Sequence, residues 1–147
     1  MAVDAPKLKK RFAANLLKPP ERPTFFLDRT VGKNIFASIL RRDGHSVVIH
    51  DDQFPPDARD ADWLPVVGAR GWVVVTNDRR IRYRPLELAA LKASKVRAFV
   101  FTRGNLTAEE MATIFLRAMP KIYRILRKKK GPFIASISRD SELRVIL

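Results

Sequence analysis

The sequence predicts a three-layer α/β sandwich, in which helices flank a central, mostly parallel β-sheet. Short apolar runs alternate along the chain with segments of helical spacing, and that order is typical of parallel sheets. One run, residues 72–76, is almost entirely apolar and β-branched, as in a strand buried on both faces. The chain has 147 residues, of which 46% are hydrophobic, so it is long enough and apolar enough to fold around a core.

Residues 1–23 are predicted to form a basic N-terminal extension, and residues 24–147 the folded domain. A short helix within the extension, over residues 7–17, must end before the consecutive prolines at positions 19 and 20. No internal repeat and no linker divides the rest of the chain. The sequence therefore predicts one domain behind an extension.

The first half of the domain is predicted to contain three strands and two helices. Asp43-Gly44 is a typical helix end, and Asp60 is predicted to cap the second helix through its carboxylate. In chain order, we expect a strand at 24–28, a helix at 31–42, a strand at 46–50, an irregular loop at 51–59, a helix from 60 that ends at Gly71, and a strand at 72–76.

The second half begins with a helix at 86–94, introduced by Pro85, and a strand at 96–102. Thr107 and Glu110 have the spacing of a capping box and predict a long helix to about residue 130. Pro120 lies inside that helix and should kink or split it, because proline lacks the N–H of the helical hydrogen bond. Two terminal strands are expected around a turn at 139–141.

Charge is the strongest indication of a partner. The chain carries 29 Lys and Arg against 15 Asp and Glu, a formal net charge of +14. Such a protein attracts polyanions, and nucleic acid is favoured over the competing explanation, an anionic membrane surface.

The sequence has no cysteine, which excludes a disulfide scaffold, a cysteine-bound zinc and a thiol nucleophile. No apolar stretch is long enough to span a membrane and no signal peptide is visible, so we expect a cytoplasmic protein.

Carboxylates gather at the predicted ends of parallel strands. Asp28 ends the first strand and Asp78 follows the third, while Asp60 and Asp62 begin a helix that starts near the same edge of the sheet. Clustered carboxylates repel one another, and a divalent cation such as Mg²⁺ relieves that repulsion. The pattern predicts a Mg²⁺ or Mn²⁺ site that activates water for phosphodiester hydrolysis. Taken singly, Asp28 has a simpler explanation as a helix cap and Asp78 as a turn residue.

Basic side chains follow the same strand ends and are predicted to hold nucleic-acid phosphates by charge and hydrogen bonds. A solvated loop is the simpler alternative for the arginines at 79–84, and a plain solvated face is the alternative for a second basic stripe along the long helix. His50 lies near the acids, but a lone histidine at a strand end is more often structural than a ligand. The predicted nucleic-acid-binding residues are Arg29, Lys33, Arg79, Arg80, Arg82 and Arg103.

Four segments, taken together in their order and spacing, resemble the PIN-like ribonuclease toxins (VapC-type) of VapBC toxin–antitoxin modules. They are Phe-Phe-Leu-Asp at 25–28, His-Asp-Asp at 50–52, Asp-Ala-Asp-Trp-Leu at 60–64 and Val-Val-Val-Thr-Asn-Asp at 73–78. The resemblance spans residues 24 to about 140. It implies a PIN-like sandwich and a magnesium- or manganese-dependent endoribonuclease, held inactive by a cognate antitoxin. RNA would be the substrate, with tRNA one candidate, and a homodimer is an open alternative.

By that resemblance, Asp28 and Asp78 match metal-binding acids, and Asp60 or Asp62 falls where a helix-borne acid is expected. Larger PIN domains usually have a glutamate there and a fourth acid further on, whereas the charged residues at 79–84 are all arginines. The alternative is therefore a non-catalytic nucleic-acid-binding PIN-like module with an incomplete metal site. A phosphoacceptor receiver domain, suggested by Asp51-Asp52, would need its acid pair after the first strand.

Overall fold

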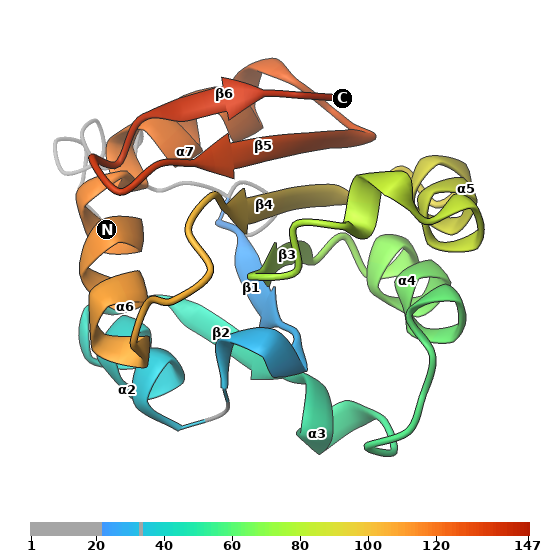
Figure 1. Ribbon diagram of the computed structural model, residues 1–147, viewed down its shortest axis with the longest axis horizontal. Coiled ribbons are helices and arrows are strands. Elements are labelled where there is room, and N and C mark those ends of the chain that lie inside the picture. The colour runs from blue at the N-terminus through green and yellow to red at the C-terminus, as the bar shows by residue number, and fades with distance from the viewer. Residues whose placement is uncertain (1–21, 33) are drawn as a thin grey trace, which may run out of the picture.

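Six strands form one sheet in the order β2-β1-β3-β4-β5-β6, parallel throughout except for β6, which runs antiparallel to β5 (Figure 1). The computed structural model describes residues 22–32 and 34–147, so the predicted helix of the extension and Lys33 lie outside the described residues. The elements are β1 (Thr24–Leu27), η2 (Arg29–Val31), α2 (Ile35–Arg42), β2 (Ser46–Ile49), α3 (His50–Gln53), α4 (Asp60–Ala69), β3 (Val73–Thr76), η3 (Ile81–Tyr83), α5 (Pro85–Ala93), β4 (Arg97–Phe101), α6 (Ala108–Arg117), α7 (Met119–Lys128), β5 (Phe133–Ile137) and β6 (Leu143–Val145).

Alternate residues of the five parallel strands face two separate cores. Phe25 and Leu27 of β1 point into a core shared with α2, α6 and α7, whereas Phe26 points into a core shared with α4 and α5. Val73–Thr76 is buried along its whole length, because both of its faces are covered. The predicted three-layer sandwich is therefore confirmed: in the described part of the chain, α4 and α5 cover one face of the sheet, and α2, α6 and α7 cover the other (Figure 1).

The predicted helix at 31–42 is wrong at its start. Val31 belongs to the short helix η2, and Gly32 follows it with φ of +81°, a left-handed conformation that breaks the helix and favours glycine. The α-helix begins at Ile35 instead. The second strand is also shorter than predicted, because His50 opens α3 within the segment expected to be a strand end and a loop.

The long C-terminal helix begins and splits as predicted. Thr107 Oγ1 accepts a hydrogen bond from the amide of Glu110 at 3.1 Å, and Glu110 Oε1 accepts one from the amide of Thr107 at 2.8 Å. The helix is interrupted at Ala118, and Pro120 lies in the first turn of the second segment, α7. Thus the capping box and the proline together set the bounds of α6 and α7.

Parallel pairing brings the functional segments to one edge of the sheet. Strands β1, β3 and β4 are neighbours in register, so Asp28, Asp78 and the loop after Phe101 all follow strand ends at that edge. Helix α4 follows β2 and α3 and therefore starts near the same edge. Within the described part of the chain, no helix is both long and apolar enough to cross a membrane.

Candidate functional site

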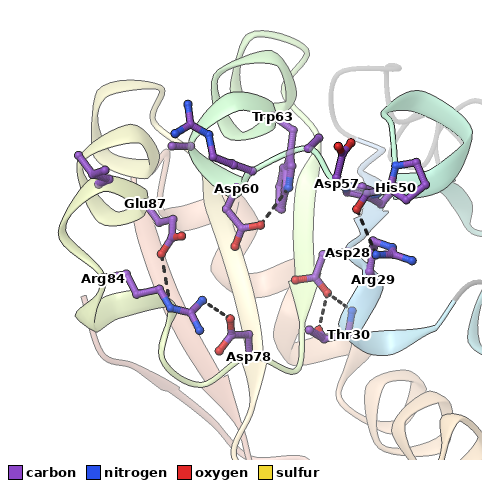
Figure 2. Close-up of a pocket in the computed structure, with 15 residues that line it drawn as sticks. Asp28, Arg29, Thr30, His50, Asp57, Asp60, Trp63, Asp78, Arg84 and Glu87 are labelled. Carbon is purple, nitrogen blue, oxygen red and sulfur yellow. Dashed lines mark hydrogen bonds and ion pairs between the residues drawn. The ribbon is translucent and has the colours of Figure 1, made fainter.

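A cavity of about 440 Å³ opens at this edge of the sheet, between the ends of β1 and β3 and the first turns of α4 and α5. Figure 2 shows acidic side chains from these separate segments turned toward the same space. The carboxylates that line the cavity are Asp28, Asp57, Asp60, Asp78 and Glu87. Three of the four predicted metal ligands are therefore brought together, and Asp57 and Glu87 are additions that were not among the predicted site residues.

Asp28 is the most deeply buried of these acids, with only 6% of its surface exposed. Its Oδ2 accepts a hydrogen bond from the Thr76 hydroxyl at 2.5 Å, and its Oδ1 accepts bonds from the Thr30 amide at 2.9 Å and from the Thr30 hydroxyl. Burial raises the pKa of Asp28 to about 6, although these hydrogen bonds lower it, and the negative charge of Asp60 adds to the rise. Among the described residues, Asp28 has no ion-pair partner.

The two threonines also connect Asp28 to the segment after β3. The Thr30 hydroxyl oxygen accepts a hydrogen bond from the Asn77 amide at 2.7 Å, and that of Thr76 accepts one from the Asp78 amide at 3.0 Å. The backbone before Asp78 is thus held against the loop that carries Asp28. Neither threonine was among the predicted site residues, although Thr30 is two residues from Asp28 and Thr76 is two residues from Asp78.

Asp60 and Asp62 point in different directions from α4. Asp60 lines the cavity, is half-buried, and accepts a hydrogen bond from Trp63 Nε1 at 3.1 Å. Burial raises the pKa of Asp60, and the charge of Asp78 contributes to the rise. Asp62 lies outside the cavity with its side chain 55% exposed, and it accepts two hydrogen bonds from Arg59. The predicted capping role of Asp60 is wrong, because Arg59 occupies the N-cap without a side-chain bond.

Asp78 is paired with a cation inside the cavity. Arg84 Nη1 lies 2.5 Å from Asp78 Oδ2, and Arg84 Nε lies 3.7 Å from Glu87 Oε1 (Figure 2). Burial raises the pKa of Glu87, and Glu87 Oε1 is buried with no hydrogen bond of its own. Pro85 could have pointed to Glu87, because proline favours the first position of a helix. A helix that starts after β3 brings its first turn, with Glu87, to the carboxyl edge of the sheet.

Arg29 and Arg79 contact the loops around the cavity. Arg29 lines the cavity itself, with its side chain 54% exposed, an ion pair to Asp51 at 3.1 Å and a hydrogen bond to the Pro56 carbonyl at 3.1 Å. Arg79 donates a hydrogen bond to the Thr102 carbonyl at 3.2 Å and so joins the loops after β3 and β4. Both guanidinium groups retain donors for a phosphate.

The other predicted phosphate-binding residues within the described part of the chain differ in exposure and in the contacts that their side chains make. Arg80 extends into solvent with its side chain 76% exposed, and its Nε lies 3.8 Å from Asp78 Oδ1. Arg82 lies over the ring of Tyr83 at 4.8 Å and donates to its hydroxyl. Arg103 is exposed in the loop after β4. Of these three residues, Arg80 is therefore the one whose side chain contacts a carboxylate of the cavity, and it remains open to solvent.

His50 has a structural environment. Its ring is buried, packs against Phe26 and Trp63, and shares a hydrogen bond of 2.9 Å with Asp51. Although His50 lines the cavity, aromatic rings enclose it on the side of the core. The structural explanation favoured for this histidine therefore holds for its packing.

The oxygen atoms that line the cavity are of the kind that binds a divalent cation. They are carboxylate oxygens, which Mg²⁺ and Mn²⁺ prefer, and they include the unbonded Oε1 of Glu87 and the cation-free carboxylate of Asp28. Among residues 22–32 and 34–147, no three Asp, Glu or His side chains stand close enough to hold one ion as they lie. An ion shared by three of these acids therefore requires side chains to move inward.

Comparisons with known proteins identify the family of the chain. A family model described as "PIN like domain" matches residues 23–103, which is more than half of the chain. A protein of Mycobacterium tuberculosis (strain ATCC 25618 / H37Rv) named "Putative ribonuclease VapC45" is 24% identical over 125 residues, covering 82% of this chain and 90% of that protein. No solved structure matches the chain significantly. With its sandwich fold and more than half of its length matched, the chain belongs to the PIN-like domain family.

Proposed function

We propose that this protein is a metal-dependent endoribonuclease toxin of a VapBC-type toxin–antitoxin module, acting in the cytoplasm. One observation carries the proposal: Asp28, Asp60 and Asp78, from three separate segments, line one cavity on a protein of net charge +14. The similarity to a protein named as a ribonuclease supports it. RNA is the proposed substrate, with tRNA as a candidate, and a cognate antitoxin is the proposed protein partner.

Each side chain has a role that follows from its position. Asp28, Asp60 and Asp78 would hold Mg²⁺ or Mn²⁺, with Thr30 and Thr76 fixing the orientation of the Asp28 carboxylate. When bound there, the cation supplies Lewis-acid polarisation of the phosphate and lowers the pKa of water. Arg29 and Arg80, at the rim, would bind the neighbouring phosphates by charge and hydrogen bonds.

We expect cleavage of a mixed RNA pool by the purified protein in Mg²⁺ or Mn²⁺, and its loss when a chelator is added. A matched pair of variants tests the assignment of the acids on α4. Asp60→Asn should abolish cleavage because Asp60 lines the cavity, whereas Asp62→Asn should retain it because Asp62 is exposed and paired with Arg59. Gel electrophoresis of the products measures both. Cleavage that persists in the chelator, or that survives in Asp60→Asn, would contradict the metal site.

RNA binding should weaken steeply with salt, because neutralised phosphates release counterions. Replacing Arg80 by glutamine should reduce the log–log salt slope by roughly one, the change expected for one lost phosphate contact. The slope is measured by filter binding of labelled RNA in a chelator, so that no cleavage occurs. Arg127→Gln, on α7 in the opposite helical layer, removes the same charge and should change the slope less. Equal slopes for both variants would place the phosphate contacts elsewhere.

The alternative function is a non-catalytic nucleic-acid-binding module, and one observation favours it. Arg84 already neutralises Asp78, and no three acids among the described residues are spaced for one ion. Such a module would bind RNA with the same salt dependence but would leave it intact in Mg²⁺ and in Mn²⁺. The cleavage assay therefore separates the two functions directly.

A further inference from the structure

Arg84 holds an unusual position among the basic residues of this edge. Its side chain is 34% exposed and lines the carboxylate cavity, where the guanidinium contacts Asp78 and approaches Glu87. It also interacts electrostatically with Asp60, and the three acids together raise the pKa of Arg84. Arg84 is therefore a positive charge between Asp78 and Glu87 within the cavity that Asp60 also lines (Figure 2).

The backbone fixes this placement. Arg84 is the N-cap residue of α5 and precedes Pro85, which restricts it to the extended conformation observed, with ψ of 114°. Two other arginines of the same segment lie outside the cavity: Arg82 lies over the Tyr83 ring, and Arg80 is 76% exposed and approaches Asp78 only from the rim, with its Nε 3.8 Å from Oδ1. The inward direction of Arg84 is thus particular to its own side chain.

A divalent cation and Arg84 require the same oxygen atoms. Asp78 Oδ2 accepts the hydrogen bond from Arg84 Nη1 at 2.5 Å, so the guanidinium occupies a lone-pair position through which that oxygen would bind a metal ion. The two cations also repel each other at close range, and this repulsion is strong in a partly buried site. Asp28 and Glu87 Oε1, by contrast, hold no strong bond to a cation. Competition for oxygen is therefore concentrated at Asp78.

We propose that Arg84 is an internal counter-ion that competes with the divalent cation for Asp78, and that metal binding displaces its guanidinium from that carboxylate. The inference rests on the proposed function, since it requires a cation to bind among these acids. Arg84 stabilises the crowded carboxylates when no metal is bound, and it lowers the affinity of the site for metal. The displaced guanidinium remains at the cavity, where an RNA phosphate would lie.

Calorimetric titration of the full chain with MnCl₂, without RNA, tests the competition. Arg84→Gln removes the guanidinium and should bind Mn²⁺ at least about tenfold more tightly than the parent protein. Arg82→Gln is the matched control, because it removes the same charge from the same segment but from a side chain that lies over Tyr83. Its affinity should stay within about threefold of the parent value, which allows for long-range charge effects alone.

Thermal melting supplies a second measurement that does not depend on activity. Arg84→Gln should melt at a lower temperature than the parent in a chelator, because its carboxylates lose their counter-ion, and Mn²⁺ should raise its midpoint by more. If Arg84→Gln does not melt cooperatively, Arg84→Lys replaces it. Lysine keeps the charge but lacks the planar fork, so Mn²⁺ affinity should rise by a smaller factor, about threefold.

Equal or weaker Mn²⁺ binding by the Arg84 variant, relative to the parent and to Arg82→Gln, would overturn the inference. Asp28→Asn separates that result from failure of the proposed function. If the parent binds Mn²⁺ and Asp28→Asn does not, the metal site stands and only the role of Arg84 is lost. If neither the parent nor Arg84→Gln binds Mn²⁺, or if Asp28→Asn binds it as tightly as the parent, the proposed metal site fails as well.

Discussion

Replacing Asp28 by asparagine is expected to abolish metal-dependent RNA cleavage while leaving the fold intact. Asparagine has nearly the same shape, and its oxygen can still accept the hydrogen bond from the Thr30 amide. What it lacks is the negative charge of the one acid that is buried without an ion-pair partner among the described residues. Loss of a metal-holding carboxylate should reduce cleavage by at least about a hundredfold, the scale of a lost electrostatic contact in catalysis.

The measurement is the initial rate of cleavage of an RNA pool in Mg²⁺, for the parent and for Asp28→Asn at equal concentrations. Asp52→Asn is the control, because it removes one carboxylate charge from an exposed position on α3 that does not line the carboxylate cavity. It should cleave at the parent rate. Full activity of Asp28→Asn would contradict the metal role. Asp28 would then be only the N-cap of η2, where its side chain accepts a hydrogen bond from the Thr30 amide.

The same variant is expected to be more stable than the parent, and increasingly so as the pH rises. The pKa of Asp28 is raised from an ordinary value of 3.8 to about 6 by burial. Between these two values the folded protein binds more protons than the unfolded chain, so the contribution of Asp28 to stability falls as the pH rises through this window. Above the folded pKa the ionised, buried group costs its full amount, about 3 kcal/mol. Asparagine carries no such cost.

Urea unfolding in a chelator, from about pH 4 to about pH 7, measures this effect as a difference between the two proteins. The difference removes the contributions of the other acids, which titrate in both. The free energy of unfolding of Asp28→Asn relative to the parent should grow with pH, by up to about 3 kcal/mol, and level off above about pH 6. A difference that stays constant across this range would mean that Asp28 has the same pKa in the folded and the unfolded protein.

The fold and two of the site acids were determined by local sequence patterns. Alternating apolar runs and helical segments are sufficient to predict a parallel sheet, and the buried run at Val73–Thr76 is indeed the central strand. Asp28 and Asp78 could be placed because each follows a strand, and parallel strands end at a common edge whatever their detailed packing. The capping box at Thr107 was also predictable, because both of its bonds lie within four residues.

Other parts of the site depend on how the helices pack, which the sequence does not state locally. Asp60 and Asp62 are two residues apart, so they project from different sides of α4, and the burial of Trp63 and Leu64 against the sheet decides which acid faces the cavity. Glu87 belongs to the site because α5 packs beside α4 and brings its first turn to the edge of the sheet.

The charge state of the site was likewise decided by the tertiary structure. In the sequence, Arg84 is one of several arginines after Asp78, and although Pro85 restricts its backbone, no local pattern states which neighbours its side chain meets. Only the folded chain turns Arg84 inward to Asp78 and Arg82 onto Tyr83, because successive side chains of this irregular segment face different neighbours. The chain order thus determined which residues reach the edge of the sheet, and packing determined which of them share a charge.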